Sequence, residues 1–418
     1  MSVWPLPRIT FRELNTVHET RPAALLTSDE VWAVLGTQLT LPVLIQAEPA
    51  RYSRDLLDYL AAHLPSQVKV IYAVGGGAPL EAGKVIAARN HIPLVIVPTA
   101  LDSTLMFMPA ALVEDQVENR PYRKLLEVDP ATEIIIDWAV IQSAPDPVRA
   151  AGIVDVLSIV TGLLDWRYAA QKGKNPREQR FAPWAAGVAT DLAKEAIKTS
   201  AAIGRGQRDS LQNLLHLMML AVQLSNQLGH TRAQQGGEHV LAHILGATTS
   251  PGLAYSELVG PCLLFCAALH SQDPAPLREA MQNAHVRLDQ IRATDFSLLI
   301  DDLATYLADY DAPYSLLNDL DPQSEMVAQA LEAAGLALLP ETWAAPEETP
   351  PIEAVIPPLE AGPDDQVEVA DAEVEAEAQT QVETEAGTPV EAQTEEEAQV
   401  YGSDETHPTE GPANLTGG

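Results

Sequence analysis

Three consecutive glycines, Gly75 to Gly77, separate an apolar run at 68–74 from a helix-compatible segment at 80–89. A strand, a glycine turn and a helix in this order present backbone N–H groups and a positive helix end, which together bind phosphate. Glycine is suited to this place because a Cβ would obstruct both the turn and the approach of a pyrophosphate. A tight turn without a ligand gives the same pattern, so the glycines alone leave the two interpretations open.

Two histidines form the second group of residues with chemical potential. His239 and His243 follow Gly236-Gly237-Glu238, and on a helix their spacing of four puts both rings on one face. The pair suits metal coordination, or one metal ligand beside one proton-relay histidine. Asp155, at an apolar helix start, is either a further ligand or a carboxylate favoured by the helix dipole. Ordinary surface or core histidines are the competing interpretation.

Alternating strands and helices are expected to position these groups. Apolar runs predict strands and leucines on one face predict a helix, with strands at 23–27, 41–46, 68–74, 92–97 and 133–137, helices at 52–64 and 80–89, and a hairpin at 111–128. The alternation predicts a parallel, doubly wound sheet, whose ligands gather at the carboxyl ends of the strands. The glycine turn and Thr99 both fall at those ends.

The residue pattern changes near residue 145 from alternating strands and helices to a pattern that is helix-like throughout, as far as residue 339. We predict a nucleotide-binding α/β domain of the Rossmann type at 1–145 and an all-α domain at 146–340. Residues 341–418 contain 21 Asp and Glu but no Lys or Arg, and almost no aromatic residues. Such a segment buries too little apolar area to offset chain entropy, so we predict a disordered acidic tail.

Composition excludes several classes of function. The formal charge is −33, and the first 340 residues still carry 37 acidic against 25 basic side chains, which disfavours binding to nucleic acid. No apolar run reaches the roughly 20 residues of a membrane span. The first residues do not resemble a signal peptide, so we expect a cytoplasmic location. The two cysteines, Cys262 and Cys266, are expected to be buried thiols.

The order of these pieces resembles the superfamily of dehydroquinate synthase, glycerol dehydrogenase and iron-containing alcohol dehydrogenases, and glycerol-1-phosphate dehydrogenase in particular. Asp155, in Ala151-Gly-Ile-Val-Asp155, is followed ten residues later by Asp165-Trp166, as in the Ala-Ser-Gly-x-x-Asp and Asp-Trp segments of that family. Its Gly-Ser-Glu-His segment is matched by Gly236-Gly237-Glu238-His239. The resemblance covers roughly residues 20 to 340.

The resemblance implies that NAD or NADP lies in a cleft with its pyrophosphate on Gly75, Gly76 and Gly77. Asp29 would then meet the adenosine part and Thr99 the nicotinamide. Two further residues, Lys84 and Ser103, are assigned to the same cofactor site. A homo-oligomer acting on a small molecule is expected.

The resemblance also implies a divalent ion, zinc, nickel or iron, held by Asp155, His239 and a third helical ligand. The ion would lower the pKa of the alcohol so that hydride can leave. His243 would either lie beside the metal ligands and orient them or relay protons.

Two motifs depart from the family. The third ligand position holds Tyr255, a phenol with pKa about 10 and a poor zinc ligand. Either Glu257 or water completes a rebuilt metal site, or metal-dependent catalysis has been lost. The family's aspartate after Pro-Thr is replaced by Thr104, while Asp102 stands two residues earlier and is a candidate catalytic residue.

Three functions follow from these observations. The first is an NAD(P)-dependent, metal-assisted oxidoreductase acting on a small polyol or polyol phosphate. The second is a non-catalytic nucleotide-binding protein on the same fold. The third is a dehydroquinate-synthase-like lyase, against which the absence of a Lys-Thr-Gly run after Pro98-Thr99 counts.

Overall fold

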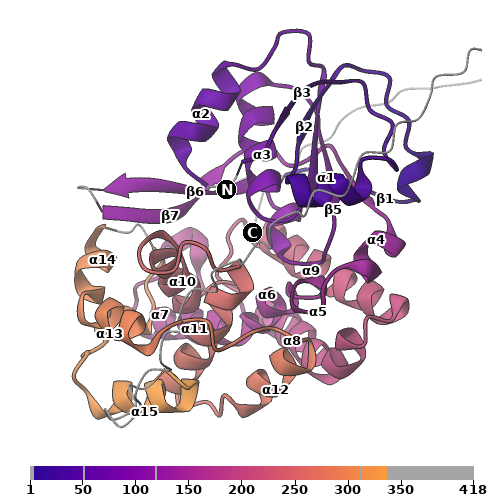
Figure 1. Ribbon diagram of the computed structural model, residues 1–418. Coiled ribbons are helices and arrows are strands. Elements are labelled where there is room, and N and C mark those ends of the chain that lie inside the picture. Colours follow the sequence, from indigo (N-terminus) through magenta and orange to yellow (C-terminus); the bar gives the residue numbers. More distant parts are fainter. Residues whose placement is uncertain (1–3, 50–51, 118–119, 310–311, 337–418) are drawn as a thin grey trace, which may run out of the picture. The chain divides into compact units, whose positions relative to one another are not determined.

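The computed structural model describes residues 4–49, 52–117, 120–309 and 312–336 (Figure 1). These residues fall within one of the two units of the chain, Met1–Pro346. The acidic tail predicted for 341–418 lies outside the described residues, and the domain boundary near 145 stays a prediction.

A six-stranded parallel sheet forms the N-terminal part of the described chain. Its strand order is β1-β8-β5-β4-β2-β3. The strands are β1 (Arg8–Phe11), β2 (Ala23–Leu26), β3 (Val43–Ala47), β4 (Val70–Gly75), β5 (Leu94–Pro98) and β8 (Glu133–Ile136). Strands β2, β4, β5 and β8 are buried along their whole length, which explains why they are continuous apolar runs and not alternating ones.

Alternate side chains of each central strand enter two different cores, one on each face of the sheet. In β4, Ile71 and Ala73 belong to one core, while Val70, Tyr72 and Val74 belong to the other. Helices α2 (Arg54–Ala62) and α3 (Ala78–Asn90) contribute to the first core, and α1 (Asp29–Leu35) contributes to the second. The predicted doubly wound arrangement is therefore confirmed (Figure 1).

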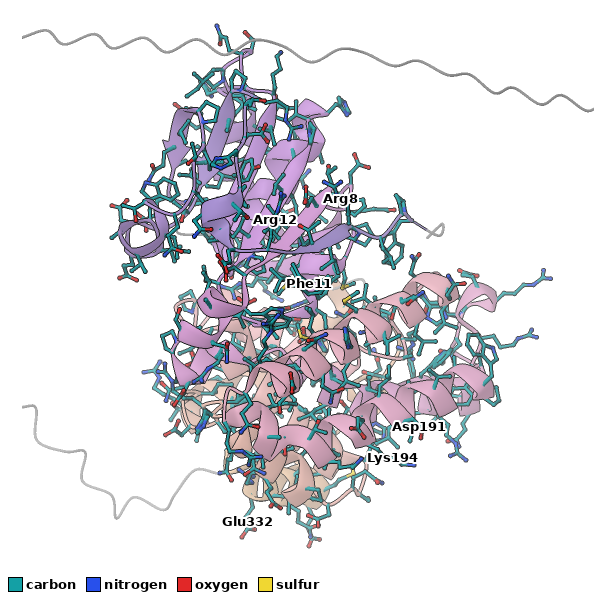
Figure 2. The ribbon with its side chains drawn as sticks, turned by 90° about the vertical axis from the view of Figure 1, so that its right-hand side faces the viewer. Arg8, Phe11, Arg12, Asp191, Lys194 and Glu332 are labelled. Carbon is teal, nitrogen blue, oxygen red and sulfur yellow. The ribbon has the colours of Figure 1, made fainter. Side chains whose placement is uncertain are left out.

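Strand β1 is the element that the sequence pattern does not reveal. It is an edge strand of four residues, and polar contacts hold it in register beside β8. Glu133 accepts hydrogen bonds from Arg8 at 2.6 Å, Thr10 at 2.8 Å and Arg12 at 3.0 Å. Figure 2 labels Arg8, Phe11 and Arg12 at this edge. Because polar contacts to one carboxylate hold β1 in place, its sequence shows little of the apolar pattern by which strands are predicted.

The predicted hairpin is confirmed as the antiparallel pair β6 (Ala110–Val117) and β7 (Arg120–Glu127). It extends away from the main sheet, and β7 packs against α10 (Gly237–Ala247) (Figure 1). The hairpin therefore joins the sheet to the helices that follow it in the chain.

The elements of the described chain are helical from residue 138 onward, whereas the sequence predicts the helical region from residue 146. Together with η1 (Leu14–Thr16) and η2 (Thr104–Phe107) earlier in the chain, the remaining elements are α4 (Trp138–Ser143), α5 (Asp146–Arg149), α6 (Ile153–Leu157), α7 (Ile159–Gln171), η3 (Arg177–Gln179), α8 (Pro183–Gly204), α9 (Arg208–Leu228), α10, α11 (Tyr255–Leu269), α12 (Ala275–Asn283), α13 (Ala293–Asp301), α14 (Leu303–Asp309), η4 (Leu316–Asp319) and α15 (Glu325–Ala334). Cys262 and Cys266 are buried in α11, and burial raises the pKa of both thiols. Within the described part of the chain, every helix is too short or too polar to cross a bilayer.

Candidate functional site

The topological switch point of the sheet lies between β2 and β4. After β2 the chain adds β3 on one side, and β4 and β5 lie on the other. A doubly wound sheet binds ligands in the crevice outside the carboxyl ends of such strands. Strand β2 leads there into Ser28, which caps α1 by accepting the Val31 N–H at 3.3 Å. Strand β4 leads into the three glycines.

The glycine turn has the backbone conformation that its composition suggests. Gly75 has a φ of 134° and Gly77 a φ of 55°, values that residues with a Cβ rarely adopt. Gly77 is the N-cap of α3, a helix of 13 residues. The turn therefore aims the N-terminus of a long helix at the switch point, which is the arrangement that binds phosphate.

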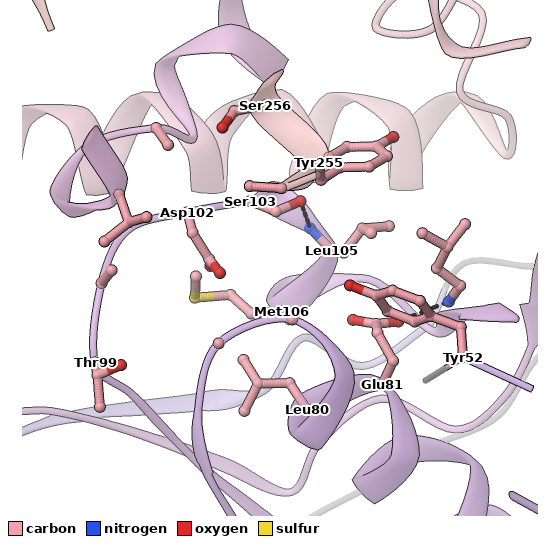
Figure 3. Close-up of a pocket in the computed structure, with 17 residues that line it drawn as sticks. Tyr52, Leu80, Glu81, Thr99, Asp102, Ser103, Leu105, Met106, Tyr255 and Ser256 are labelled. Carbon is pink, nitrogen blue, oxygen red and sulfur yellow. Dashed lines mark hydrogen bonds between the residues drawn. The ribbon is translucent and has the colours of Figure 1, made fainter. Parts of the chain in front are cut away.

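A cavity of about 290 Å³ opens at this turn (Figure 3). Gly76, Gly77, Thr99, Asp102 and Ser103 line it from the carboxyl ends of the strands. On its other side the cavity is lined by the first residues of α11, including Tyr255 and Ser256. The cavity thus brings together predicted site residues that are up to about 180 positions apart in the chain.

The predicted cofactor residues take different places around this cavity. The N–H of Thr99 donates to the carbonyl oxygen of Gly75 at 3.0 Å, which ties the end of β5 to the glycine turn. Ser103 donates to Asp155 Oδ2 at 3.0 Å and accepts from the Leu105 N–H at 3.2 Å. Asp29 is exposed at the start of α1, near the carboxyl end of β2.

Lys84 corrects one prediction, because its ammonium group is not available to a cofactor. The side chain is fully buried. It donates to Glu81 Oε1 at 2.9 Å and to the carbonyl oxygens of Leu105 at 2.6 Å and Ala110 at 2.9 Å. These bonds use all three donors of the ammonium group. Lys84 therefore fixes α3 to η2 and β6 from beneath the cavity.

Asp102 points into the cavity (Figure 3). Burial raises the pKa of its carboxyl group to about 7, and the nearby carboxylates of Glu81 and Asp155 add to the shift. The backbone N–H groups of Asp102 itself and of Gly77 oppose it. Asp102 is therefore a carboxyl group held near its midpoint at neutral pH.

His239, His243 and Tyr255 form a triangle of aromatic rings in the helical part. The ring centroids are 6.4 Å apart for the two histidines, 6.0 Å for His239 and Tyr255, and 6.1 Å for His243 and Tyr255. Nδ1 of His239 donates a hydrogen bond to Glu238 Oε1, a carboxylate acceptor, at 2.8 Å. Burial lowers the pKa of His243 to about 3, so this ring is neutral.

The two histidines line a second cavity of about 430 Å³, together with Tyr122 and Lys124 of β7. The predicted catalytic pair is therefore divided, since Asp102 lines the first cavity and His243 the second. Tyr255 lines the first cavity and packs against both histidine rings, so it separates the two sites.

The donors present do not fit the metal that the resemblance implies. Asp155 Oδ2 accepts from Ser103 Oγ and from both N–H and Oγ1 of Thr104. Glu257, the suggested substitute ligand, accepts from the Ala254 N–H at 2.9 Å and pairs with Arg287 at 3.3 Å. Among residues 4–49, 52–117, 120–309 and 312–336, no three His, Cys, Asp or Glu side chains are grouped to hold an ion. A catalytic zinc site requires three such protein ligands.

Tyr52 is a cavity residue that sequence reasoning missed. A Cβ placed on Gly77 would lie 3.2 Å from its Oη, so the phenol closes one side of the glycine turn. Burial raises its pKa, and the Arg123 guanidinium lies 4.8 Å from its ring centroid. In the sequence Tyr52 is the first residue of the helix predicted at 52–64, and no local signal relates it to the glycines; in the structure it precedes α2.

Comparisons with known proteins agree with this fold. The family model described as iron-containing alcohol dehydrogenase matches residues 11–145. The NAD(P)+ glycerol-1-phosphate dehydrogenase of Thermoplasma acidophilum is 25% identical over 278 residues, which cover 65% of this chain and 76% of that protein. The protein of the same name from Methanothrix thermoacetophila is 27% identical over 238 residues, or 56% of this chain and 62% of that protein.

A solved structure has the same fold over most of the chain. It is sulfoacetaldehyde reductase from Bifidobacterium kashiwanohense in complex with NAD+, with a TM-score of 0.57, 13% identity, and coverage of 81% of this chain and 99% of that one. The sheet, its glycine turn and the helices that follow define a Rossmann-type α/β fold with a helical C-terminal region. The chain is similar to the iron-containing alcohol dehydrogenases and, among curated proteins, to glycerol-1-phosphate dehydrogenases. The resemblance and the fold class predicted from the sequence are confirmed.

Proposed function

We propose that this chain is an NAD(P)-dependent oxidoreductase acting on a small polyol or polyol phosphate, related to glycerol-1-phosphate dehydrogenase. The observation that carries the proposal is the turn at Gly75 to Gly77, which leads into the N-terminus of α3 beside a cavity. The names of the curated relatives, which include NAD(P)+ and glycerol-1-phosphate, support the cofactor and the substrate class.

In this proposal, the backbone at Gly76 and Gly77 and the helix end hold the pyrophosphate. A bound nicotinamide dinucleotide supplies or accepts the hydride. Thr99 fixes the end of β5 against the glycine turn, and its side of the cavity faces Tyr255 and Ser256 of α11. The cavity wall here is mostly apolar, which excludes water from the transfer of hydride. No step is assigned to a metal, because the donors do not fit one.

The test combines binding with turnover. NADH and NADPH are titrated into the full chain by calorimetry, and oxidation of the bound nucleotide by glycerone phosphate is followed at its nicotinamide absorbance. We expect saturable binding of one nucleotide per chain and consumption of NADH or NADPH that depends on the ketone. Failure of both nucleotides to bind at millimolar concentration would overturn the proposal.

A second candidate function is nucleotide binding without catalysis. The observation that favours it is that Asp155 Oδ2 and both carboxylate oxygens of Glu257 are engaged by protein donors, while Tyr255 stands in the third ligand position. On this alternative, NADH raises the melting temperature of the chain, because ligand binds only the native state. No carbonyl compound then oxidises the bound NADH. Turnover that is lost in Thr99→Val, with nucleotide binding kept, would exclude this alternative.

A further inference from the structure

A carboxylate lies directly over the glycine turn that would hold a phosphate. A Cβ placed on Gly76 would lie 2.5 Å from Oδ2 of Asp102 and 3.4 Å from its Cγ. The backbone N–H of Gly77, the N-cap of α3, acts on the same carboxyl group. In the structure, the anion that faces this turn is therefore a side chain of the protein itself (Figure 3).

The charges around Asp102 make its position unusual. Glu81 of α3 and Asp155 of α6 are both acidic, and the remaining titratable groups are the phenols of Tyr52 and of Tyr255. Glu81 is neutralised by Lys84, and Asp155 is bonded to Ser103 and Thr104. Within the described residues, the lining of this cavity includes no Lys, Arg or His. The hydrogen-bond donors that face Asp102 are therefore mainly backbone N–H groups, and the positive potential at its carboxylate comes mainly from the N-terminus of α3.

We propose that the Asp102 carboxylate competes with phosphate for the glycine turn. A dinucleotide must displace this carboxylate from the turn in order to bind. This inference rests on the proposed function. A carboxylate oxygen and a phosphate oxygen cannot accept the same N–H, and two anions at contact distance repel each other strongly in a partly buried site. Asp102 must turn away or take up a proton before the pyrophosphate can bind, and both steps weaken binding.

Asp102 thereby sets both the affinity and the selectivity of the cavity. A ligand that presents a cationic group to the carboxylate can bind without displacing it, whereas a dinucleotide has to displace it from the glycine turn. Replacement by asparagine keeps the shape of the side chain and removes the charge, so the repulsion is lost and the turn can exchange one hydrogen-bond acceptor for another. A glutamate variant changes the size of the side chain but keeps its charge, so it distinguishes an effect of size from an effect of charge.

The test is the dissociation constant of NADH, measured by calorimetry on the full chain and on Asp102→Asn, Asp102→Ala and Asp102→Glu. At about pH 8 we expect the asparagine and alanine variants to bind NADH at least about tenfold more tightly than the original chain, a gain of about 1.4 kcal/mol. The glutamate variant should bind no more tightly than the original. Asp129→Asn, which removes an exposed carboxylate before β8, is the charge-matched control and should leave binding unchanged.

A second arm repeats the titration at about pH 6, where Asp102 is largely protonated and the advantage of Asp102→Asn should shrink by several-fold. Equal affinity of the original chain and both neutral variants at the higher pH would overturn the inference while leaving the proposed function intact. The same titrations are repeated with NADPH, and absence of binding of both NADH and NADPH in every variant at both pH values would overturn the proposed function and the inference together.

Discussion

Thr104 and Asp155 are joined by two hydrogen bonds, from the Thr104 N–H at 2.6 Å and from its hydroxyl at 2.8 Å, both to the same oxygen Oδ2. Asp155 was a predicted metal ligand, and Thr104 occupies the position where the family commonly has an aspartate. In this chain the hydrogen-bond donor Thr104 stands in place of that aspartate. The Asp155 carboxylate of α6 caps η2 by accepting the Thr104 N–H. The polar contacts of this region hold the loop after β5 in place.

Removal of the hydroxyl tests this role. We expect Thr104→Val to lower the free energy of unfolding by about 1–3 kcal/mol, because a buried carboxylate loses one of its donors. Urea denaturation followed by circular dichroism measures the change. Thr190→Val, which removes a half-buried hydroxyl that bonds only within α8, is the matched control and should cost less. Equal losses would show that the bond to Asp155 has no special role.

The aromatic triangle predicts that Tyr255→His creates a zinc site. Three imidazoles bound to one zinc through Zn–N bonds of about 2.0–2.1 Å place their ring centroids roughly 5–6 Å apart. The three rings are already 6.0–6.4 Å apart, and burial keeps His243 neutral. We expect the variant to retain zinc in competition with a chelating dye, whereas the original chain does not.

Two variants control this experiment. Tyr255→Phe keeps the ring but offers no ligand atom, and it should bind no zinc. The double variant Tyr255→His with His239→Ala removes one corner of the triangle and should lose the zinc that the single variant retains. Zinc retention by the double variant would mean that the metal binds elsewhere in the chain.

The fold was accessible from the sequence because its signal is local. The buried strands β4 and β5 are continuous apolar runs, and the glycines between β4 and α3 mark a turn that few other residues allow. Strand β1 escaped detection because its place depends on hydrogen bonds to Glu133, more than 120 residues away.

The site was only partly accessible, because its decisive contacts are between distant segments. The motif that contains Lys84 predicts a cofactor ligand, but its three carbonyl and carboxylate partners become known only when η2 and β6 are placed. Likewise, the spacing of Asp102 and His243 does not reveal that they line different cavities. Tyr52 reaches the glycine turn only through the packing of its own loop.

The glycine turn gives a prediction with a closely matched control. We expect Gly77→Ala to weaken NADH binding at least about tenfold, because its φ of 55° is strained for a residue with a Cβ and the Cβ would lie 3.2 Å from Tyr52 Oη. Gly173→Ala has a similar backbone strain, with a φ of 66°, but its Cβ would meet nothing within 4 Å. Calorimetric titration of both variants with NADH distinguishes a specific effect at the glycine turn from a general effect of backbone strain. Equal affinities would remove the glycine turn from the nucleotide site.

Asp102 also predicts how stability depends on pH. The pKa of its carboxyl group is about 7 in the folded chain against an ordinary value of 3.8, so the folded state binds more protons than the unfolded state between these pH values. The stability of the original chain therefore falls as pH rises from about 4 to about 7, at up to about 1.4 kcal/mol per pH unit from this group. We expect Asp102→Asn to raise the melting temperature at about pH 8 and to change it little at about pH 4. A shift of equal size at both pH values would contradict a charge effect.

The buried pair Glu81–Lys84 and the exposed pair Asp191–Lys194 have the same i,i+3 spacing and provide the sharpest comparison in the chain. The first pair has a distance of 2.9 Å and side-chain exposures of 6% and 0%, whereas the second has 3.9 Å and exposures of 83% and 72% (Figure 2). Lys84→Met leaves the Glu81 carboxylate buried without its cation and two carbonyl groups without a donor, so we expect a loss of about 3–5 kcal/mol in the free energy of unfolding. Lys194→Met should change stability little, because water screens the exposed pair. If chemical denaturation gives similar values for both variants, the network beneath the cavity does not hold α3 in place, and Lys84 returns as a candidate for contact with the cofactor.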